Sequence, residues 1–267
     1  MKRRQGGVAL AIVLWFIAGM TLLVAGIVSH ARVDTQMAQI HMARAKAVAA
    51  GDGAIQLMMV DLMTAAEDPG PAPVGNYRLG GTDVGVALVP AAGLIDINTA
   101  SVDVLSALFL LAAGMSEEEA RWLAENMVQS RSAGPEGGLK LDAIEDMLRI
   151  PGSSRSLLDA VRDFIVVGIS GQGTTDWSQA PDALLKVLAL ANTAQAESAR
   201  SQRVSGGGAR ANAYRADAYV RYGDKTWLRR RWISIESRPG SALPWHAIRT
   251  EPPRVLAQDS YLLGRGI

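Results

Sequence analysis

The first thirty residues of the chain are dominated by an unbroken apolar run. Residues 8–28 carry no charged side chain, and they follow a basic leader, residues 1–7, that contains Lys2, Arg3 and Arg4. At about 1.5 Å of rise per residue, the run makes a helix of about 31 Å, enough to cross a bilayer core of roughly 30 Å. Basic residues before such a helix favour a cytoplasmic N-terminus. The pattern predicts one membrane-spanning helix, with the bulk of the chain outside.

Three interpretations of this segment compete. A cleavable secretory signal has an apolar core of about 7–15 residues before a small-x-small site, and Ser29-His30-Ala31 fits such a site only weakly. A plain signal anchor fits the length. The third interpretation uses Gly7, because a basic leader that ends in glycine and runs directly into an apolar helix resembles the prepilin-type leader of type IV pilins and type II secretion pseudopilins. That resemblance implies cleavage between Gly7 and Val8 by a prepilin peptidase and methylation of the new amino terminus.

Helical periodicity continues beyond the membrane run. No proline occurs between the apolar run and Pro69, and one stripe of apolar residues recurs at spacings of three and four. The stripe is Val33, Met37, Ile40, Ala43, Ala47, Ala50, Ala54 and Leu57. Together the two halves predict a helix of roughly 56 residues, or about 84 Å, that stops at residues 67–71. The alternative is an anchor followed by a separate short helix. The stripe fits packing on the chain's own domain or on neighbouring helices, and the pattern does not divide the two.

Two β-hairpins are predicted on either side of a helical region. Residues 77–79 and 84–89 flank a Gly-Gly turn, and residues 214–222 alternate as a half-buried strand before a Gly-Asp turn and a return strand over 226–236. The three consecutive arginines 229–231 alternate between faces of that return strand, so we expect a solvated or edge-protecting strand. The tail, residues 239–267, is expected to be mostly irregular.

The region between the hairpins has the pattern of several short helices. Ser116 and Glu119 make a capping box for one of them, and further helices are expected over 139–148 and 156–166. A weak repeat relates the segment that begins at Gly93 to the segment that begins at Gly173, at a constant offset of 80 residues.

The order of these elements predicts an α+β fold. A long N-terminal helix packs on a small antiparallel sheet, and a large all-α domain is inserted between the strands. The predicted parts are a leader (1–7), the transmembrane part of the helix (8–28), its outer half (29–68), the αβ core (72–92 and 209–267) and the inserted helical domain (93–200).

Composition adds mainly exclusions. The net charge of +1 gives no electrostatic case for nucleic acid or an acidic substrate. The chain has no cysteine, and His30, His41 and His246 have no metal-ligand spacing. We therefore expect no catalytic residue, no metal ligand and no enzyme activity.

The motifs together resemble one family. The run GGVALAIVLWFIAGM, the entry GLIDINTASVDVLSAL, the RIPG turn and the second entry GTTDWSQAPDALL are similar to the minor pseudopilin GspK of type II secretion systems. The resemblance implies a pseudopilin αβ core with an inserted helical domain, anchored in the inner membrane with its bulk in the periplasm. It also implies assembly with the minor pseudopilins GspI, GspJ and GspH at the pseudopilus tip, in support of protein export across the outer membrane; a secreted substrate is a further candidate partner.

The resemblance also concerns the fifth position after the cleavage site. Most pilin-like subunits carry glutamate there, whereas GspK proteins carry an apolar residue, and this chain has Ile12. A buried carboxylate at membrane depth costs roughly 2.5–3.5 kcal/mol and is kept only for a partner. A subunit without it suits the end of a filament.

The chain departs from the family in one respect. Structural calcium is known in the family, but residues 124–138 contain only Glu125 and Glu136 as carboxylates. Calcium takes six to eight oxygen ligands, usually with several carboxylates among them. We therefore assign no calcium site and no other cofactor.

Two other functions remain open. One is a minor pilin of a type IV pilus, which shares the leader. The other is a membrane-anchored receptor for DNA, because helix-hairpin-helix modules share the Ile-Asn-Thr-Ala style of entry. Such modules present basic residues to phosphate, and Arg155 is the base near the turns here. We therefore expect no nucleic-acid partner.

Overall fold

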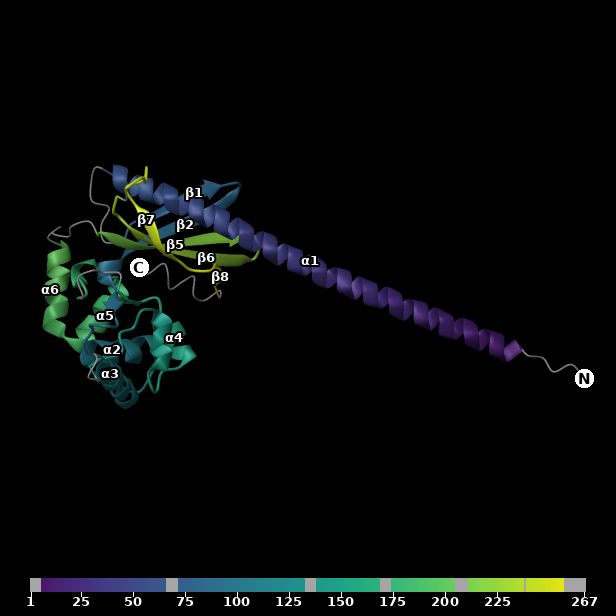
Figure 1. The fold of residues 1–267 in the computed structure, drawn as a ribbon, viewed down its shortest axis with the longest axis horizontal. Helices are drawn as coiled ribbons and strands as arrows, with labels where there is room; N and C mark the ends of the chain where they lie inside the picture. The colour runs from purple at the N-terminus through teal and green to yellow at the C-terminus, as the bar shows by residue number, and fades with distance from the viewer. Residues whose placement is uncertain are drawn as a thin grey trace, which may run out of the picture.

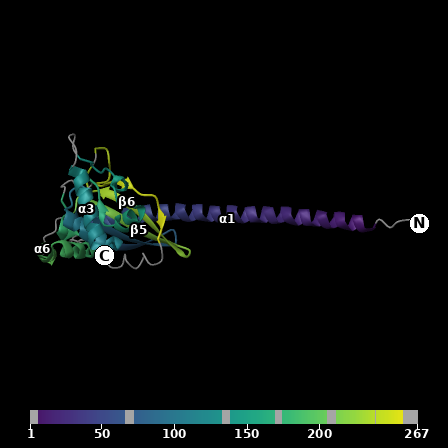
Figure 2. The same ribbon diagram turned by 90° about the horizontal axis from the view of Figure 1, so that it is seen from below.

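The computed structural model describes residues 6–65, 72–132, 138–168, 174–204, 211–237 and 239–256. One helix projects far beyond a head that contains a sheet and a helical region (Figure 1). The view turned by 90° shows the same projection, so its first half runs alone, away from the head (Figure 2). The helical region lies at the end of the molecule away from the N-terminus (Figure 1).

The predicted long helix is one continuous element. Helix α1 (Gly6–Thr64) spans 59 residues without a break. It therefore joins the apolar run to the striped half, as predicted, and no separate short helix follows an anchor. The predicted stop overlaps residues 66–71, which lie outside the described residues.

The sheet is antiparallel and has the strand order β1-β2-β5-β6-β7, with β8 also paired to β6. Both predicted hairpins are confirmed by the register of their strands. The positive φ angles of Gly80 and Gly81, 56° and 77°, allow the tight first turn. The strands are β1 (Val74–Leu79), β2 (Thr82–Pro90), β5 (Ala213–Tyr222), β6 (Lys225–Ser234), β7 (His246–Thr250) and β8 (Arg254–Val255).

The tail, expected to be mostly irregular, contains two short strands, β7 at 246–250 and β8 at 254–255. Strands β7 and β8 satisfy the outer edge of β6, whose backbone groups would otherwise lack partners. The side chain of Trp245 is buried in the core between α1 and the sheet, and its indole N–H donates to Gln56 at 3.0 Å. Short strands between prolines are hard to predict from the local sequence. The long-range contact between Trp245 and α1 explains why this part of the tail has a defined structure.

One face of the sheet packs on the second half of α1. Alternate residues of the strands, such as Val86, Leu88, Ala216 and Val220, share a core with α1. A period of two in the strands and of about 3.6 in the helix brings these side chains together. The predicted class is confirmed: a long N-terminal helix packed on an antiparallel sheet in an α+β chain.

The helical region is inserted between β2 and β5 and has its own core. Its helices are α2 (Val102–Ala113), α3 (Glu117–Ser132), α4 (Arg155–Val161), α5 (Asp182–Ala191) and α6 (Thr193–Val204), and its 3-10 turns are η1 (Ala91–Gly93), η2 (Ile144–Arg149) and η3 (Trp177–Gln179). Ser116 and Glu119 form the predicted capping box before α3, with the Ser116 hydroxyl 2.8 Å from the carboxylate.

Two short helices differ from the prediction. The segment expected as a helix over 139–148 forms only a 3-10 turn at 144–149, where the Asp146 carboxylate accepts from the N–H groups of Asp142 and Ala143 at 3.0 Å. The segment expected over 156–166 ends as a helix at Val161. Its last residues form strand β4 (Ile165–Val166), parallel to β3 (Ile95–Asp96), so the region is not purely helical.

The two repeated entries have the same local geometry. Helices α2 and α5 begin 80 residues apart, at Val102 and Asp182. Before each helix an aspartate, Asp96 or Asp176, accepts a hydrogen bond from the N–H two residues later, at 2.9 and 3.1 Å. The entries also contact each other, because the Asp176 N–H donates to the carbonyl of Ala92 at 2.7 Å.

Candidate assembly surface

The first part of α1 has no cover within the chain. Every side chain from residue 10 to residue 42 is exposed. Among the described residues, α1 is the one helix long and apolar enough to cross a membrane, and its apolar window has no buried side chain. Burying apolar surface is favourable by about 25 cal/mol per Å². Such a surface is therefore driven out of water, into lipid or against other apolar helices.

The predicted processing positions lie at the start of this helix. Gly7 and Val8 are in the first turn of α1, and residues 1–5 lie outside the described residues. Ile12 lies one turn beyond Val8, and its side chain is 64% exposed. The three positions therefore share the outer end of the uncovered helix.

The apolar stripe of α1 divides between two environments. Val33, Met37 and Ile40 are exposed, with 56% exposure at Met37, whereas Ala43 and Ala47 are buried against the sheet. Farther along the stripe, Ala50 and Ala54 also face the sheet. Leu57 is exposed, because other residues fill the core at that level, namely Ile55, Met58 and Met59. The sequence pattern does not reveal this division. We call Val33, Met37 and Ile40 the bare stripe.

Close packing of α1 on β6 depends on a glycine. A Cβ added at Gly51 would lie 2.8 Å from the Cβ of Arg229. Such a separation is shorter than van der Waals contact, so only glycine allows this approach. Gly51, which weakens the helix locally by propensity, therefore has a packing role.

An ion pair joins α1 to β6 beside this glycine. The Arg229 guanidinium donates to both carboxylate oxygens of Asp52, at 2.8 and 3.1 Å, and to the carbonyl of Glu251 at 2.8 Å. Arg231 lies 3.6 Å from the same carboxylate. The pair is bidentate and mostly buried on the arginine side, which makes it directional as well as attractive.

The middle arginine of the run points to the opposite face of the sheet. Arg230 donates to both carboxylate oxygens of Asp217, at 2.6 and 2.9 Å, and to Asp163 at 2.6 Å. Arg215 donates to Asp217 at 3.0 Å and to the carbonyl of Asp163. Arg254 donates to the Asp163 carboxylate at 3.1 Å. We call these five residues the ionic cluster.

These contacts correct two expectations. Strand β6 is interior, between β5 and β7, so it is not an edge strand, and Arg229 and Arg230 are buried, not solvated. Strand β5 is buried on both faces at Arg215 and Asp217, not half-buried. Strands β7 and β8 make β6 interior, and the helical region covers the second face, where Arg215, Asp217 and Arg230 are buried. The sequence feature that could have indicated this burial is the alternation of charged residues in a central strand, because buried charges require partners.

Electrostatics keep the ionic cluster charged. Burial alone would raise the pKa of Asp163, but the guanidinium groups of Arg230, Arg215 and Arg254 hold it well below its usual range. Burial would likewise lower the pKa of Arg230, but Asp217 and Asp163 hold it above the ordinary arginine value. Because Asp163 lies between α4 and β4, the cluster ties the helical region to the sheet in one orientation.

The described residues contain no group of three histidine, cysteine or acidic side chains that could hold a metal ion. His30 and His41 lie on α1, and His246 lies on β7, where its Nδ1 atom is 3.2 Å from the carbonyl oxygen of Glu236. Of the two carboxylates noted for calcium, Glu125 pairs with Arg121 at 3.2 Å, and Glu136 lies outside the described residues.

Comparison with known proteins gives little. No family model and no curated protein matches the sequence. A solved structure that matches is a chain of the GspK-GspI-GspJ complex from the type II secretion system of enterotoxigenic Escherichia coli. The identity is 14%, the match covers 84% of this chain and 100% of that chain, and the TM-score is 0.47. At these values the function has to be inferred from this chain's own residues.

Proposed function

We propose that the chain is a membrane-anchored minor pseudopilin of a type II secretion system, of the GspK kind, which acts by assembly and not as an enzyme. The observation that carries the proposal is α1. It begins at the leader glycines, runs uncovered for its first half, and then packs on a sheet without interruption. A cleaved signal would not continue into the packed half, and a plain anchor would not need the bare stripe.

The proposed topology follows from the same helix. The basic leader stays in the cytoplasm, residues 8–28 cross the inner membrane, and the head lies in the periplasm. A prepilin peptidase cleaves between Gly7 and Val8, and the amino group of Val8 is methylated.

The proposed partners are other minor pseudopilins. In this proposal GspI, GspJ and GspH pack their helices against the uncovered half of α1, and the complex initiates and caps the pseudopilus. The bare stripe supports such contacts, because three exposed apolar side chains on one helix face lie beyond the membrane run. The helical region is held rigidly at the far end and would present the tip.

Ile12 is the residue proposed to set the place in the filament. A glutamate at this depth would need a partner amino group on a neighbouring subunit, and isoleucine cannot provide that pairing. The chain would therefore have no subunit beyond it.

The first test is the intact mass of the membrane-purified protein, with and without a prepilin peptidase. The expected result is loss of residues 1–7 and addition of one methyl group on Val8, and no change without the peptidase. A Gly7→Val variant is expected to stay uncut. A chain that stays intact with the peptidase, or that begins at Arg32, would overturn the pseudopilin proposal.

A second test concerns placement. Ile12→Glu is expected to reduce secretion, because the new carboxylate loses its water without a partner, while Ile12→Leu is expected to leave secretion unchanged. The readout is the amount of exported protein together with co-purification of the other minor pseudopilins. Normal assembly and secretion with Ile12→Glu would show that this position does not set placement.

A further inference from the structure

The sheet has two outer edges, and they differ in how they are protected. The edge at β7 is short and lies between Pro244 and the pair Pro252 and Pro253, and its register with β6 shifts between Trp232 and Ile233. Prolines and bulges are the usual means by which natural sheets block further pairing. Strand β1 directly follows Pro73, but its six residues are in unbroken register with β2, without a bulge, and no proline closes its other end.

The backbone of β1 presents a free row of hydrogen-bonding groups. The Leu88 N–H donates to the carbonyl of Pro73 at 2.9 Å, which makes that pair a hydrogen-bonded one. Because such pairs alternate in an antiparallel ladder, the N–H and C=O groups of Val74, Asn76 and Arg78 point away from β2. Within the described part of the chain, no backbone hydrogen bond reaches these outward groups.

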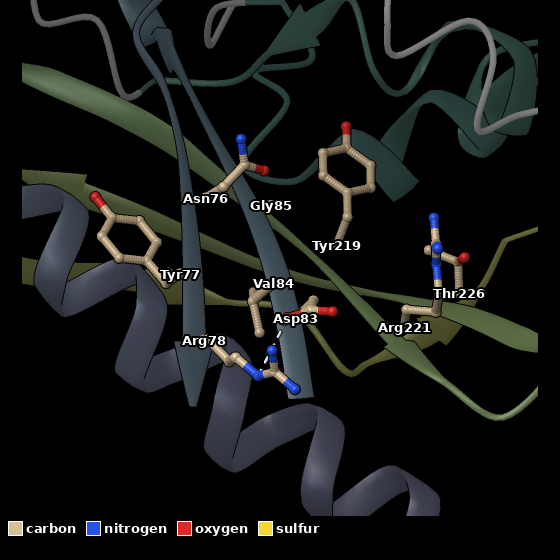
Figure 3. A pocket seen from close by; sticks show the side chains of 9 residues that line it. All are labelled: Asn76, Tyr77, Arg78, Asp83, Val84, Gly85, Tyr219, Arg221 and Thr226. Carbon is tan, nitrogen blue, oxygen red and sulfur yellow. Dashed lines mark ion pairs between the residues drawn. The ribbon is translucent and has the colours of Figure 1, made fainter. Parts of the chain in front are cut away.

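A groove lies beside this edge, on the sheet face opposite α1. Tyr77 reaches α1, where its hydroxyl lies 2.5 Å from Asp61, so the residues next to it in β1 face the other way. Asn76, Tyr219 and Arg221 stand on that other side of the sheet (Figure 3). The groove has a volume of about 350 Å³.

The floor of the groove is open because β2 has a glycine there. Gly85 pairs with Asn76 on one side and with Tyr219 on the other. A Cβ added at Gly85 would meet only the Asn76 Oδ1 atom within 4 Å, at 3.4 Å. The glycine is therefore not required by packing, and its effect is to leave room above the sheet.

The groove carries an excess of positive charge. Arg78 lies 3.7 Å from Asp83, but both side chains are more than three-quarters exposed, so the pair is weak. Arg221, which also lines the groove, makes no side-chain hydrogen bond or ion pair with the described residues. Burial, with Asp217 as a second cause, raises the pKa of Tyr219 to about 12, so its hydroxyl stays neutral.

We propose that the free edge of β1 binds an extended segment of a partner protein, which adds a strand to the sheet and places an acidic side chain beside Arg78. The partner's backbone bonds to the outward groups of Val74, Asn76 and Arg78. On the groove face, an apolar residue lies next to Val74, which is 70% exposed, and the acidic residue lies four positions away, next to Arg78. This is recognition by strand addition, with backbone bonds for affinity and alternate side chains for specificity.

This inference does not depend on the proposed function. Strand addition at β1 needs neither the leader nor the bare stripe, and the mass test of the N-terminus does not involve β1. Each proposal can therefore fail while the other stands.

The test uses the full chain in detergent micelles and residue-resolved hydrogen exchange. The probe is a synthetic peptide, Thr-Glu-Thr-Thr-Thr-Val-Thr, which pairs antiparallel so that its glutamate meets Arg78. The matched control peptide has lysine in place of glutamate. The outward amides of Val74, Asn76 and Arg78 are expected to exchange slowly with the peptide and fast without it. The inward amides of Gly75 and Tyr77, which bond to β2, serve as the internal reference.

Two pairs of variants separate the edge from the groove. Asn76→Pro removes an outward N–H donor that β2 does not use and is expected to abolish protection of the neighbouring amides. Asn76→Ala keeps this donor and is expected to keep the protection. Gly85→Leu fills the groove and is expected to weaken peptide binding, while Ala247→Leu, which places the same side chain at the β7 edge, is not. Arg78→Glu is expected to reverse the preference between the two peptides.

Each outcome decides the proposal. Protection by the glutamate peptide, with about two- to fivefold weaker binding of the lysine peptide, supports it. Unchanged exchange at millimolar peptide overturns it, and equal binding of both peptides overturns the acidic specificity. Protection that rises with protein concentration in the absence of peptide would assign the edge to a second copy of this chain and overturn the partner proposal.

Discussion

At the scale of single residues, two glycines of α1 tolerate a methyl group to different degrees. At Gly51 a new Cβ would meet the Cβ of Arg229 at 2.8 Å, and a strand backbone lies directly behind that atom. At Gly53 it would meet only the end of the Leu79 side chain, at 3.1 Å, and a flexible side chain can give way. The same substitution therefore has different costs two residues apart.

We predict that Gly51→Ala lowers the free energy of unfolding by about 1–3 kcal/mol, because overpacking separates α1 from β6. Gly53→Ala is expected to be neutral or to stabilise by up to about 1 kcal/mol through helix propensity. The measurement is denaturant unfolding of the full chain in a mild detergent, followed by tryptophan fluorescence. Equal stability of the Gly51→Ala variant and the natural chain would contradict the packing role.

At the scale of elements, α1 is one helix with two different surroundings. Its second half is buried on the sheet from Ala43 onward, and its first half, including the bare stripe, has no cover within the chain. A charge placed in the two halves should therefore have different effects. In the covered half it would be buried without a partner, and in the bare stripe it would meet only solvent or a partner helix.

We predict that Ala47→Glu destabilises the head by about 3 kcal/mol or more, because it buries an unpaired carboxylate and overfills the core. Met37→Glu is expected to leave stability within about 0.5 kcal/mol. If the bare stripe contacts other minor pseudopilins, Met37→Glu reduces their co-purification although the head stays folded. Unfolding measurements and co-purification on the same preparations separate the two effects, and unchanged co-purification would remove the stripe from the assembly surface.

Local patterns predicted α1, both hairpins and the capping box of α3, because each of these is determined by residues close in sequence. The tail strands and the parallel pair β3–β4 depend on contacts between distant residues. The same reason explains the arginines of β6: their acidic partners are Asp52, Asp163 and Asp217, from a helix, a loop and another strand. The sequence shows the charges but not which of them meet.

At the scale of the whole molecule, the sheet joins two bodies by different means. Its α1 face is an apolar core in which Asp52 pairs with Arg229 and Arg231, whereas its second face meets the helical region through the ionic cluster and through apolar contacts of residues such as Trp232. Removing one partner of a buried ion pair lowers the free energy of unfolding by about 3–5 kcal/mol. Of all the features of the fold, the orientation of the helical region should therefore depend most strongly on the charges of Asp163 and Asp217.

This dependence predicts a response to acid. The pKa of both carboxyl groups lies below the ordinary value in the folded chain, so the folded state binds fewer protons than the unfolded state. The stabilisation is complete above the unfolded pKa of about 4 and is lost as the pH falls toward the folded values. We expect constant stability near neutral pH and a fall below about pH 5, measured by denaturant unfolding across a pH series.

Two variants identify the groups responsible. Asp217→Asn leaves Arg215 and Arg230 without a charged partner between them. It should lower stability at neutral pH by about 3 kcal/mol and make the acid response less steep, because one of the two carboxyl groups that titrate is gone. Glu118→Gln, which neutralises an exposed carboxylate on α3, should change neither. An acid response in Asp217→Asn that is as steep as in the natural chain would show that Asp217 is not one of the groups responsible, and its pairing with Arg215 and Arg230 would then not be what holds the helical region on the sheet.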